Sequence, residues 1–435
     1  MTCQRFRWGG LVSVGCGVHA EIISKYRHFC KSGSETVDSP FAPANSLSWS
    51  SWLAGLQGTG GRVKTTPEDF QVEEIPAYEP VGDGEYVYLW VKKRDVSADH
   101  IRRELARVSG ITPREVGMAG LKDRKAITWQ WISVPLKANP AGQGLCGAGW
   151  TVLRAVRHRN KLRPGHLRGN RFRLVVREAK ANWESLLGQV VDHLKKVGVP
   201  NAYGAQRFGR DRQTLALGLS LLENPQLPVN PWLRRLALSA VQSHVFNTWV
   251  LNRLKAGTLR QVIEGEILGH CPRGGLFTAV DLVAEQKRLE AGEIVPAGPI
   301  PGSRILPAKG PAGLIESQLL EELNLCKLMD PSRGRLFCGT RRRALLYPSD
   351  LVWHAAPEVR GYRLEFSLPE GSYATVLAGM LLEGESWRGP EAGEKEGMDE
   401  AGEEGLTEES LEAAELSEVE GESATLGDSP VGGTE

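Results

Sequence analysis

Residues 119–131 read AGLKDRKAITWQW and place a single carboxylate, Asp123, inside a cluster of cations. Lys122 precedes it, and Arg124 and Lys125 follow it. The glycine before this cluster and the apolar, β-prone residues after it predict a turn between two strands. Such a turn holds its acid at a fixed place in the fold.

Two interpretations of Asp123 are open from these residues. Burial penalises a charged carboxylate, and neighbouring cations oppose that penalty and favour the ionised form. An ionised, positioned carboxylate can act as a nucleophile or as a base. The alternative is a surface turn with its charges in water, which is by far the commoner meaning of an isolated KDRK tetrapeptide.

Residues 161–177, KLRPGHLRGNRFRLVVR, surround Asn170 and Phe172 with five Arg and one Lys. Strand alternation places Asn170 and Phe172 on the same side. An amide and an aromatic ring that face one way can hydrogen-bond the edge of a base and stack on its ring. The alternative is Phe172 in a core with the arginines in solvent.

Three further stretches carry candidate residues. Residues 201–210, NAYGAQRFGR, form a glycine-punctuated turn around Arg207, which suits either a close approach to a phosphate or ribose or an ordinary strand-to-helix loop. Residues 66–74, TPEDFQVEE, predict an exposed Phe70 among acids, with a simple edge strand as the alternative. Residues 368–375, LPEGSYAT, place Tyr373 after a Gly-Ser turn at a helix start, where it caps a core or lines a pocket.

The net charge of +1 is the sum of a basic and an acidic part of the chain. Residues 383–435 hold 18 acidic and 2 basic residues, a charge of −16, so the preceding 382 residues carry +17. A basic body suits a polyanion, nucleic acid first, because Lys and Arg displace counterions from phosphates. A well-solvated surface is the other interpretation. The acidic tail has few large apolar residues, and we expect it to be disordered.

The seven cysteines are scattered and never form a CxxC pair. This pattern argues against a disulfide framework and against a zinc site, and it indicates a reducing cytoplasm. No apolar run approaches the length of about 20 residues that crosses a bilayer. Residues 1–20 faintly resemble a signal or transit peptide, and we expect the whole segment 1–48 to lie outside the fold and to be disordered.

Strands and helices alternate irregularly in the predicted pattern, which indicates an α+β fold. The section 214–340 mixes helices with Gly/Pro-rich joints and has a size, roughly 125 residues, that suits an inserted domain. The expected strands are 85–94, 114–119, 128–134, 151–158, 170–177, 343–347 and 362–367, and the expected helices are 98–109 with Ser97 as N-cap, 183–197 and 236–254.

Five stretches taken together resemble the TruD-type tRNA pseudouridine synthases. The resemblance covers residues 58 to about 380 and is weaker in the middle section. The stretches, in family order, are QGTGGRVKTTPEDFQVEE (57–74), VGMAGLKDRKAITWQW (116–131), RHRNKLRPGHLRGNRFRLVVR (157–177), VPNAYGAQRFGRD (199–211) and LPEGSYAT (368–375).

The resemblance implies a pseudouridine-synthase-like catalytic domain with a mixed or antiparallel sheet, in two parts at 49–213 and 341–382. An inserted TRUD domain at 214–340 interrupts it. The resemblance also implies isomerisation of uridine to pseudouridine in tRNA, at position 13 of the D-arm in the bacterial members. This reaction loses no atoms and exchanges no electrons, so it requires neither a metal nor a redox cofactor, and we expect no cofactor.

The same resemblance assigns roles to single residues. Asp123 falls on the catalytic aspartate, which would attack C1′ or remove the C2′ proton. Phe70, Asn170 and Tyr373 fall on substrate-lining positions, and Phe172 on the aromatic near the reacting nucleotide. The basic residues expected to contact RNA phosphates are Lys122, Arg124, Arg168, Arg171 and Arg207.

Departures and rivals accompany this assignment. Ala202 stands where relatives usually carry an aromatic residue, Tyr373 stands where Phe is common, and AGMLLE follows where an Arg-Glu pair is more usual. The main rival is a non-catalytic RNA-binding protein with the same basic face. Two others are an interaction scaffold and a cofactor-free glycosidase, which usually needs two carboxylates. We expect a cytoplasmic monomer that binds tRNA and contacts no membrane.

Overall fold

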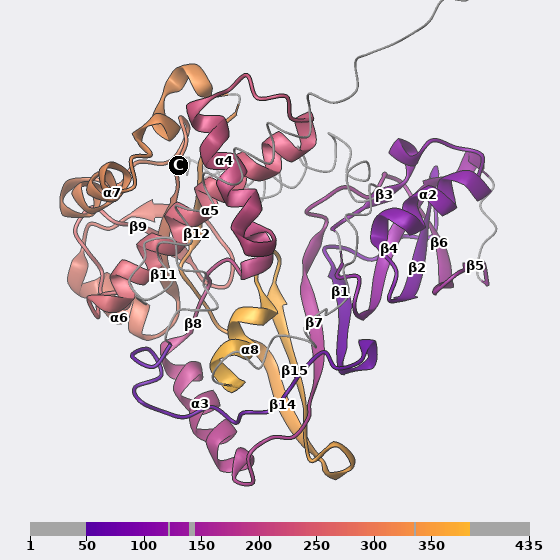
Figure 1. Cartoon of the computed structure of the whole chain (residues 1–435), viewed down its shortest axis with the longest axis horizontal. Coiled ribbons are helices and arrows are strands. Elements are labelled where there is room, and N and C mark those ends of the chain that lie inside the picture. The colour runs from indigo at the N-terminus through magenta and orange to yellow at the C-terminus, as the bar shows by residue number, and fades with distance from the viewer. Residues whose placement is uncertain (1–48, 121, 139–143, 335, 383–435) are drawn as a thin grey trace, which may run out of the picture.

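The computed structural model of the chain describes residues 49–120, 122–138, 144–334 and 336–382. The predictions of disorder for residues 1–48 and for the tail at 383–435 therefore lie outside the described residues. Within the described part, helices and strands follow one another irregularly (Figure 1), which confirms the predicted α+β class.

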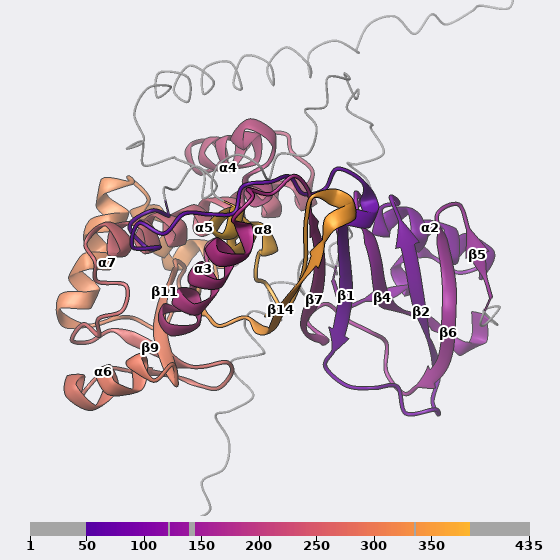
Figure 2. The ribbon, with the colours of Figure 1, turned by 90° about the horizontal axis from the view of Figure 1, so that it is seen from below.

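A mixed sheet forms the framework of the first unit. Its strands lie side by side in the order β14-β15-β7-β1-β4-β2-β6-β5, and β3 also pairs with β4 (Figure 2). β1 and β4 run parallel, whereas the other pairings within this sheet are antiparallel. The bounds are β1 Phe70–Pro76, β2 Tyr86–Arg94, β3 Gly117–Met118, β4 Ile127–Pro135, β5 Cys146–Gly147, β6 Trp150–His158, β7 Leu167–Val176, β14 Ser349–Ala356 and β15 Gly361–Pro369.

Local sequence signals account for several elements. In β2, Val87 packs on one side of the sheet and Tyr88 on the other, so the prediction of a strand covered on both sides is confirmed. Helix α2 (Ala98–Val108) begins where the Ser97 hydroxyl accepts from the backbone N–H of His100 at 3.1 Å. Helix α3 (Trp183–Val197) has the predicted bounds.

One face of the large sheet carries three helices. α2 packs over β2 and β4, while α3 and α8 (Ala374–Leu382) pack over β7 and β15. Cross-strand partners run from Lys93 through Thr128 and Val72 to Phe172, and paired residues project to the same side of a sheet. The two groups of helices therefore cover the same face, at different places along it.

The elements from α4 to β12 form a second unit, at the left of Figure 2. It has a core of its own and a four-stranded sheet in the order β10-β9-β11-β12. The long helix α5 lies at its centre, and Val241, Phe246 and Trp249 of this helix belong to the core. β8 and β13 form a two-stranded antiparallel sheet. β8 follows β7 and α3, and β13 directly precedes β14, so this small sheet lies where the chain passes between the two units. The domain boundaries at 214 and 340 stay a prediction. The bounds are β8 Val199–Pro200, α4 Gln213–Glu223, α5 Pro231–Lys255, β9 Ile267–His270, β10 Leu276–Thr278, α6 Leu282–Glu290, β11 Ile294–Ile300, α7 Gly310–Glu322, β12 Thr340–Arg343 and β13 Leu345–Leu346.

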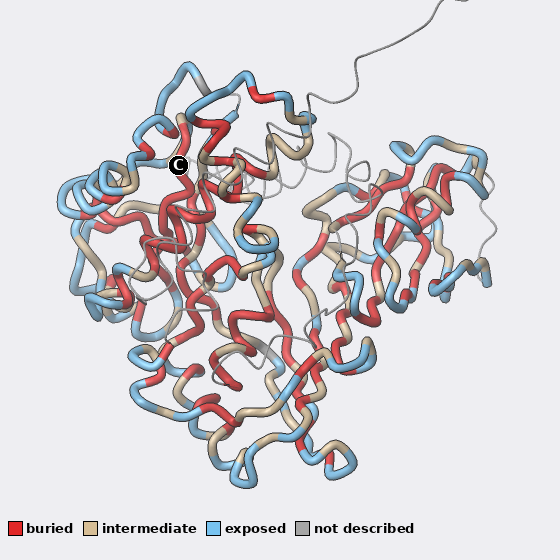
Figure 3. The backbone as a smooth tube through the Cα atoms, in the orientation of Figure 1, coloured by how far each residue is buried: buried red, intermediate tan, exposed pale blue. Residues whose placement is uncertain are grey.

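Some predicted elements differ from the observed ones. The expected strand at 114–119 is a 3-10 turn at Pro113–Glu115 followed by the two-residue β3. The helix expected from 236 begins at Pro231, because Asn230 accepts from the backbone N–H of Leu233 and proline suits the first helical position. The expected strand 343–347 is divided between β12 and β13, and β14 is not among the predicted strands. Figure 3 shows that buried residues, in red, run through both units.

Candidate active site

The turn that carries Asp123 is held from below by a buried lysine. Lys93 of β2 is 1% exposed, and its Nζ donates to the carbonyls of Val96 at 2.9 Å, Lys122 at 3.3 Å and Asp123 at 2.6 Å. Burial, opposed in part by the charge of Asp123, lowers the pKa of Lys93 to about 8. The backbone of the turn is therefore fixed to the sheet by one ammonium group.

A buried ion pair fixes the same turn a second time. Lys122 Nζ lies 3.1 Å from Glu74 Oε2, and the two side chains are 5% and 0% exposed. Glu74 Oε1 accepts from the backbone N–H of Trp131 at 3.3 Å. This placement argues against the predicted RNA contact of Lys122, because a buried ammonium beside a carboxylate is directed inward, away from a phosphate.

The Asp123 side chain itself reaches solvent. It is 49% exposed, and its Oδ2 lies 3.3 Å from Nζ of Lys64. The Lys64 ammonium also lies 3.9 Å from the centroid of the Phe70 ring. Lys64 has a φ of 56°, a left-handed conformation that is uncommon for a residue other than glycine. A carboxylate of defined direction is thus presented at the surface with a cation beside it.

An aromatic layer lies beneath this pair. The centroids of Phe70 and Phe172 are 6.1 Å apart, and Phe172 stacks on Phe366 at 5.3 Å. Phe70 is only 2% exposed, and β1 lies between β7 and β4. The predictions of an exposed Phe70 and of an edge strand are therefore wrong, because this strand pairs on both sides. Phe172 is 6% exposed, so both rings have little open surface for stacking on a base.

Asn170 extends the same face of the sheet toward β15. It pairs with Glu74 on one side and with Leu368 on the other. Its Oδ1 is buried and has no hydrogen-bond partner among the described residues. Buried polar atoms are nearly always hydrogen-bonded, so an acceptor left in this state is a candidate for contact with a ligand.

Tyr373 immediately precedes α8, as predicted from its sequence context. Its ring meets that of Tyr203 edge-on at 5.7 Å. Arg342 stacks on Tyr203 at 4.1 Å and donates to the carbonyl of Gly371 at 2.8 Å, and it also donates to Asn201. One arginine therefore joins the 201–204 turn to the turn that presents Tyr373.

Sequence comparison places these residues in a known family. The family model for tRNA pseudouridine synthase D (TruD) matches residues 46–226 and 223–379. The chain belongs to the TruD family. This confirms the resemblance drawn from the five sequence stretches.

Individual TruD relatives cover most of the described part of the chain. The tRNA pseudouridine synthase D of Anaeromyxobacter dehalogenans (strain 2CP-1) is 41% identical over 340 residues, which cover 77% of this chain and 96% of that protein. A protein of the same name from Thermus thermophilus is 38% identical over 326 residues, covering 74% and 88%. A Methanosarcina mazei crystal structure, provisionally assigned as TruD, matches with a TM-score of 0.58 and 26% identity over 76% of this chain and 95% of that one.

The structure distributes the other basic residues predicted in this TruD chain over several surfaces. Arg124 is exposed, 4.0 Å from Asp95. Arg207 donates to Ser243 of α5 at 3.0 Å. Arg168 is exposed at the start of β7. Arg171 is also exposed, but strand alternation directs it to the face opposite Asn170 and Phe172, so it is unsuited to contact the same nucleotide.

Sequence reasoning missed four residues of this TruD site, namely Lys64, Glu74, Lys93 and Gln130. Gln130 is fully buried, and both ends of its amide lack a partner among the described residues. Nothing in the local pattern distinguishes these residues from ordinary strand residues. Lys64, Glu74 and Gln130 had one signal, since they lie within the first and second of the five family stretches, whereas Lys93 lies outside all five.

Two further observations concern only the described parts of this TruD chain. No group of three or more His, Cys, Asp or Glu side chains there could hold a metal ion. None of the helices there combines the length and the apolar character needed to span a bilayer.

Proposed function

We propose that this chain isomerises uridine to pseudouridine in tRNA and that the reacting nucleotide is uridine 13 of the D-arm. We further propose that the catalytic unit consists of residues 49–213 and 341–382 and that 214–340 is the inserted domain. The observation that carries the proposal is the Asp123–Lys64 pair, since it directs one accessible carboxylate into solvent above an aromatic layer in a member of the TruD family.

The substrate must first leave its stack in the folded tRNA. Extruding a nucleotide costs a few kcal/mol, and contacts with the enzyme offset this cost. Asn170 is proposed to hydrogen-bond the ribose or the base edge through its buried oxygen, which has no partner among the described residues. Tyr373 is proposed to border the same nucleotide from the start of α8. Phe70 and Phe172 support this surface from beneath.

The reaction then exchanges one bond to the sugar for another. Asp123 attacks C1′ while the C1′–N1 bond breaks, or it removes the C2′ proton so that the uracil leaves C1′ and a glycal with a C1′–C2′ double bond forms. The freed uracil turns and C5 bonds to C1′. In the first route this expels the Asp123 carboxylate from C1′, and in the second Asp123 returns the proton to C2′. The proton on C5 then passes to solvent, and N1 takes up a proton. The proposed role of Lys64 is to orient the Asp123 carboxylate toward the sugar.

Release of tritium from tRNA that carries [5-³H]uridine tests the proposal. Asp123→Asn keeps the shape but removes the nucleophile, so we expect it to abolish release while tRNA binding survives. Substantial release by Asp123→Asn would refute the role of Asp123. Binding by the wild-type chain without any pseudouridine would instead support a non-catalytic RNA-binding protein. Mapping of pseudouridine in the product tRNA tests the choice of position 13.

A further inference from the structure

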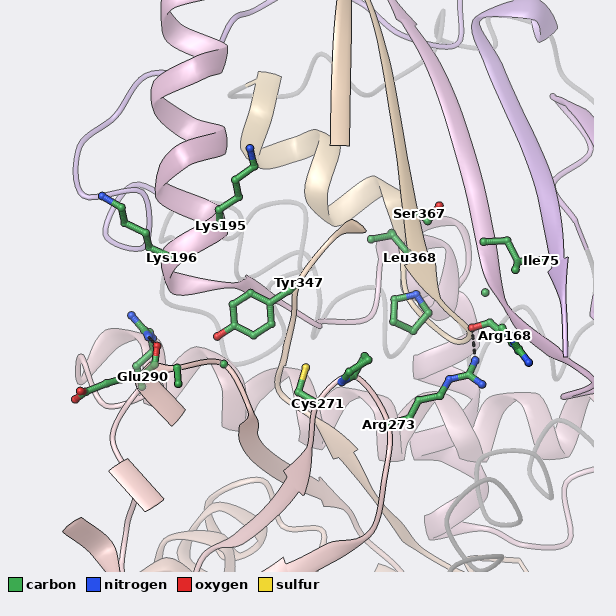
Figure 4. Close-up of a pocket in the computed structure, with 16 residues that line it drawn as sticks. Ile75, Arg168, Lys195, Lys196, Cys271, Arg273, Glu290, Tyr347, Ser367 and Leu368 are labelled. Carbon is green, nitrogen blue, oxygen red and sulfur yellow. Dashed lines mark hydrogen bonds between the residues drawn. The ribbon is translucent and has the colours of Figure 1, made fainter. Parts of the chain in front are cut away.

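The two units of the chain are separated on one face of the large sheet and in contact on the other. A groove of about 960 Å³ lies between them on the face that carries Ile75 and Ser367 (Figure 4). Asn170 lies on the opposite face, because neighbouring residues of a strand point to opposite sides and Gly169 lines the groove. On the face of Asn170, beside the start of α8, Arg342 of β12 joins the two units.

Arg342 binds two turns at once. It is 9% exposed, and its Nε donates to the carbonyl of Asn201 at 2.9 Å. Its Nη2 donates to Oδ1 of Asn201 and to the carbonyl of Gly371, both at 2.8 Å, and its guanidinium carbon lies 4.1 Å from the centroid of the Tyr203 ring. No carboxylate among the described residues pairs with this cation, so these contacts fix the orientation of the guanidinium.

The second unit also fixes Tyr203 through α5. Asn247 Oδ1 accepts from the backbone N–H of Tyr203 at 2.8 Å, and Asn247 Nδ2 donates to the Tyr203 carbonyl at 2.9 Å. The Tyr203 ring meets the ring of Phe246 edge-on at 5.8 Å. Arg342, Asn247 and Phe246 all belong to the second unit, so this unit determines where the Tyr203 ring lies.

Tyr373 lies against this arrangement. Its ring meets that of Tyr203 edge-on at 5.7 Å, and it packs against both the core of the large sheet and the core of the second unit. Gly204 has an ordinary φ of −71°, but a Cβ atom there would lie 2.9 Å from Tyr373 Cδ1 and 2.6 Å from Thr375 Oγ1. A glycine at 204 therefore permits the close approach of the turn to Tyr373.

Two polar groups beside Tyr373 indicate that a ligand binds at this place. The hydroxyl oxygens of Ser372 and Thr375 are buried and have no hydrogen-bond partner among the described residues. Buried polar atoms are nearly always hydrogen-bonded, so both are candidates for contact with a ligand. The support that Arg342 gives to Tyr373 is thus directed at a part of the site where substrate contacts are expected.

We propose that Arg342 is a positioning residue for the reaction. It holds Tyr203 and the carbonyl of Gly371 and thereby sets the Tyr373 ring against the reacting nucleotide. The second unit then takes part in turnover without touching the reacting atoms. This inference rests on the proposed function, which places Tyr373 beside the nucleotide. The alternative is a tie that only stabilises the contact between the units, and it predicts a loss of stability without a loss of rate.

Single-turnover tritium release and tRNA binding test the role of Arg342. Arg342→Met should lower the single-turnover rate roughly 10- to 100-fold, since a displacement of about 1 Å near the reacting groups can cost that much, while the Kd for tRNA stays the same. Arg342→Lys keeps the charge but lacks the planar fork that holds two acceptors and a ring, so we expect it to be nearly as slow. An Arg342→Lys variant with the wild-type rate would overturn the proposal, because charge alone would then suffice.

Gly204→Ala displaces Tyr373 without a change at Arg342, and it also serves if Arg342→Met does not fold. Its single-turnover rate should fall about 10-fold or more, again with an unchanged Kd for tRNA. The matched control is Gly379→Ala on α8, where an added Cβ would meet nothing within 4 Å, and it should keep the wild-type rate. Equal rates for Gly204→Ala and Gly379→Ala would contradict the proposal.

A double-mutant cycle shows whether Arg342 acts through Tyr373. In a Tyr373→Leu chain, Arg342→Met should lower the rate much less than it does in the wild-type chain, because the two side chains act in series. Independent losses that multiply would overturn the proposal. Each of these negative results leaves the proposed function intact, because the wild-type chain still forms pseudouridine. A wild-type chain that forms none would overturn both.

Discussion

Lys64 Nζ lies 3.3 Å from Asp123 Oδ2, so the accessible carboxylate of the turn has a cation beside it that comes from a distant part of the chain. The same ammonium contacts the Phe70 ring. A half-exposed ion pair of this kind contributes about 0–1 kcal/mol to folding. Its value to the protein therefore lies in the direction it gives to the Asp123 side chain.

Replacing Lys64 with Met should impair turnover far more than stability. We expect kcat to fall about 100-fold, because a misplacement of about 1 Å at a reacting group can cost that much. The free energy of unfolding should change by less than about 1 kcal/mol. Single-turnover tritium release and urea unfolding measure the two effects, and Lys64→Arg is the charge-retaining control. A loss of stability without a loss of rate would assign Lys64 a structural role only.

Lys122→Met should destabilise the fold by about 3–5 kcal/mol, because it leaves the Glu74 carboxylate buried without a counter-charge. The double variant Glu74→Gln and Lys122→Met should recover part of that loss, since no unpaired charge remains. Urea unfolding of both variants tests this expectation. The stability lost by Glu74→Gln alone and by Lys122→Met alone gives the comparison. If the double variant loses the sum of these two amounts, the two side chains are not coupled.

As the pH rises through the pKa of Lys93, turnover should fall while the free energy of unfolding increases. Its pKa is about 8 in the folded chain and about 10.4 when unfolded, so the unfolded state binds more protons between these values. This group therefore makes the free energy of unfolding rise with pH from about 8 to about 10.4. Turnover should fall in the same window, because the neutral amine loses a donor to the carbonyls of the turn. Profiles of kcat and of urea unfolding from about pH 7 to about pH 10 measure both, and Lys93→Met should lack the rise in stability.

Phe172 should act mainly through packing, since its ring is buried against Phe366. Phe172→Ala is expected to cost about 3–5 kcal/mol of stability, whereas Phe172→Leu keeps most of the volume and should cost less than about 1.5 kcal/mol. If the ring also aids entry of the extruded base, Phe172→Leu will still slow single-turnover pseudouridine formation. An unchanged rate for Phe172→Leu would limit its role to the core.

Removal of the acidic segment 383–435 should strengthen tRNA binding. This segment carries −16 against +17 for the rest of the chain, so it competes with RNA for the basic surface. Filter binding across a range of salt concentrations compares the truncated and full chains. The idea fails if both chains have the same tRNA affinity and the same salt slope.

The sequence alone determined the α+β class, the family and the helices with strong end signals, such as the one that begins after Ser97. These features depend on residues close together in the chain, and local patterns preserve them. It also singled out Asp123 and Asn170, because each lies in a motif of its own.

Only the tertiary structure decided what surrounds those residues. Phe70 is buried because β1 is paired on both sides, and strand pairing is a long-range choice that a single stretch does not encode. Lys122 and Glu74 neutralise each other although 48 positions separate them, so a charge that looked available for RNA is directed inward.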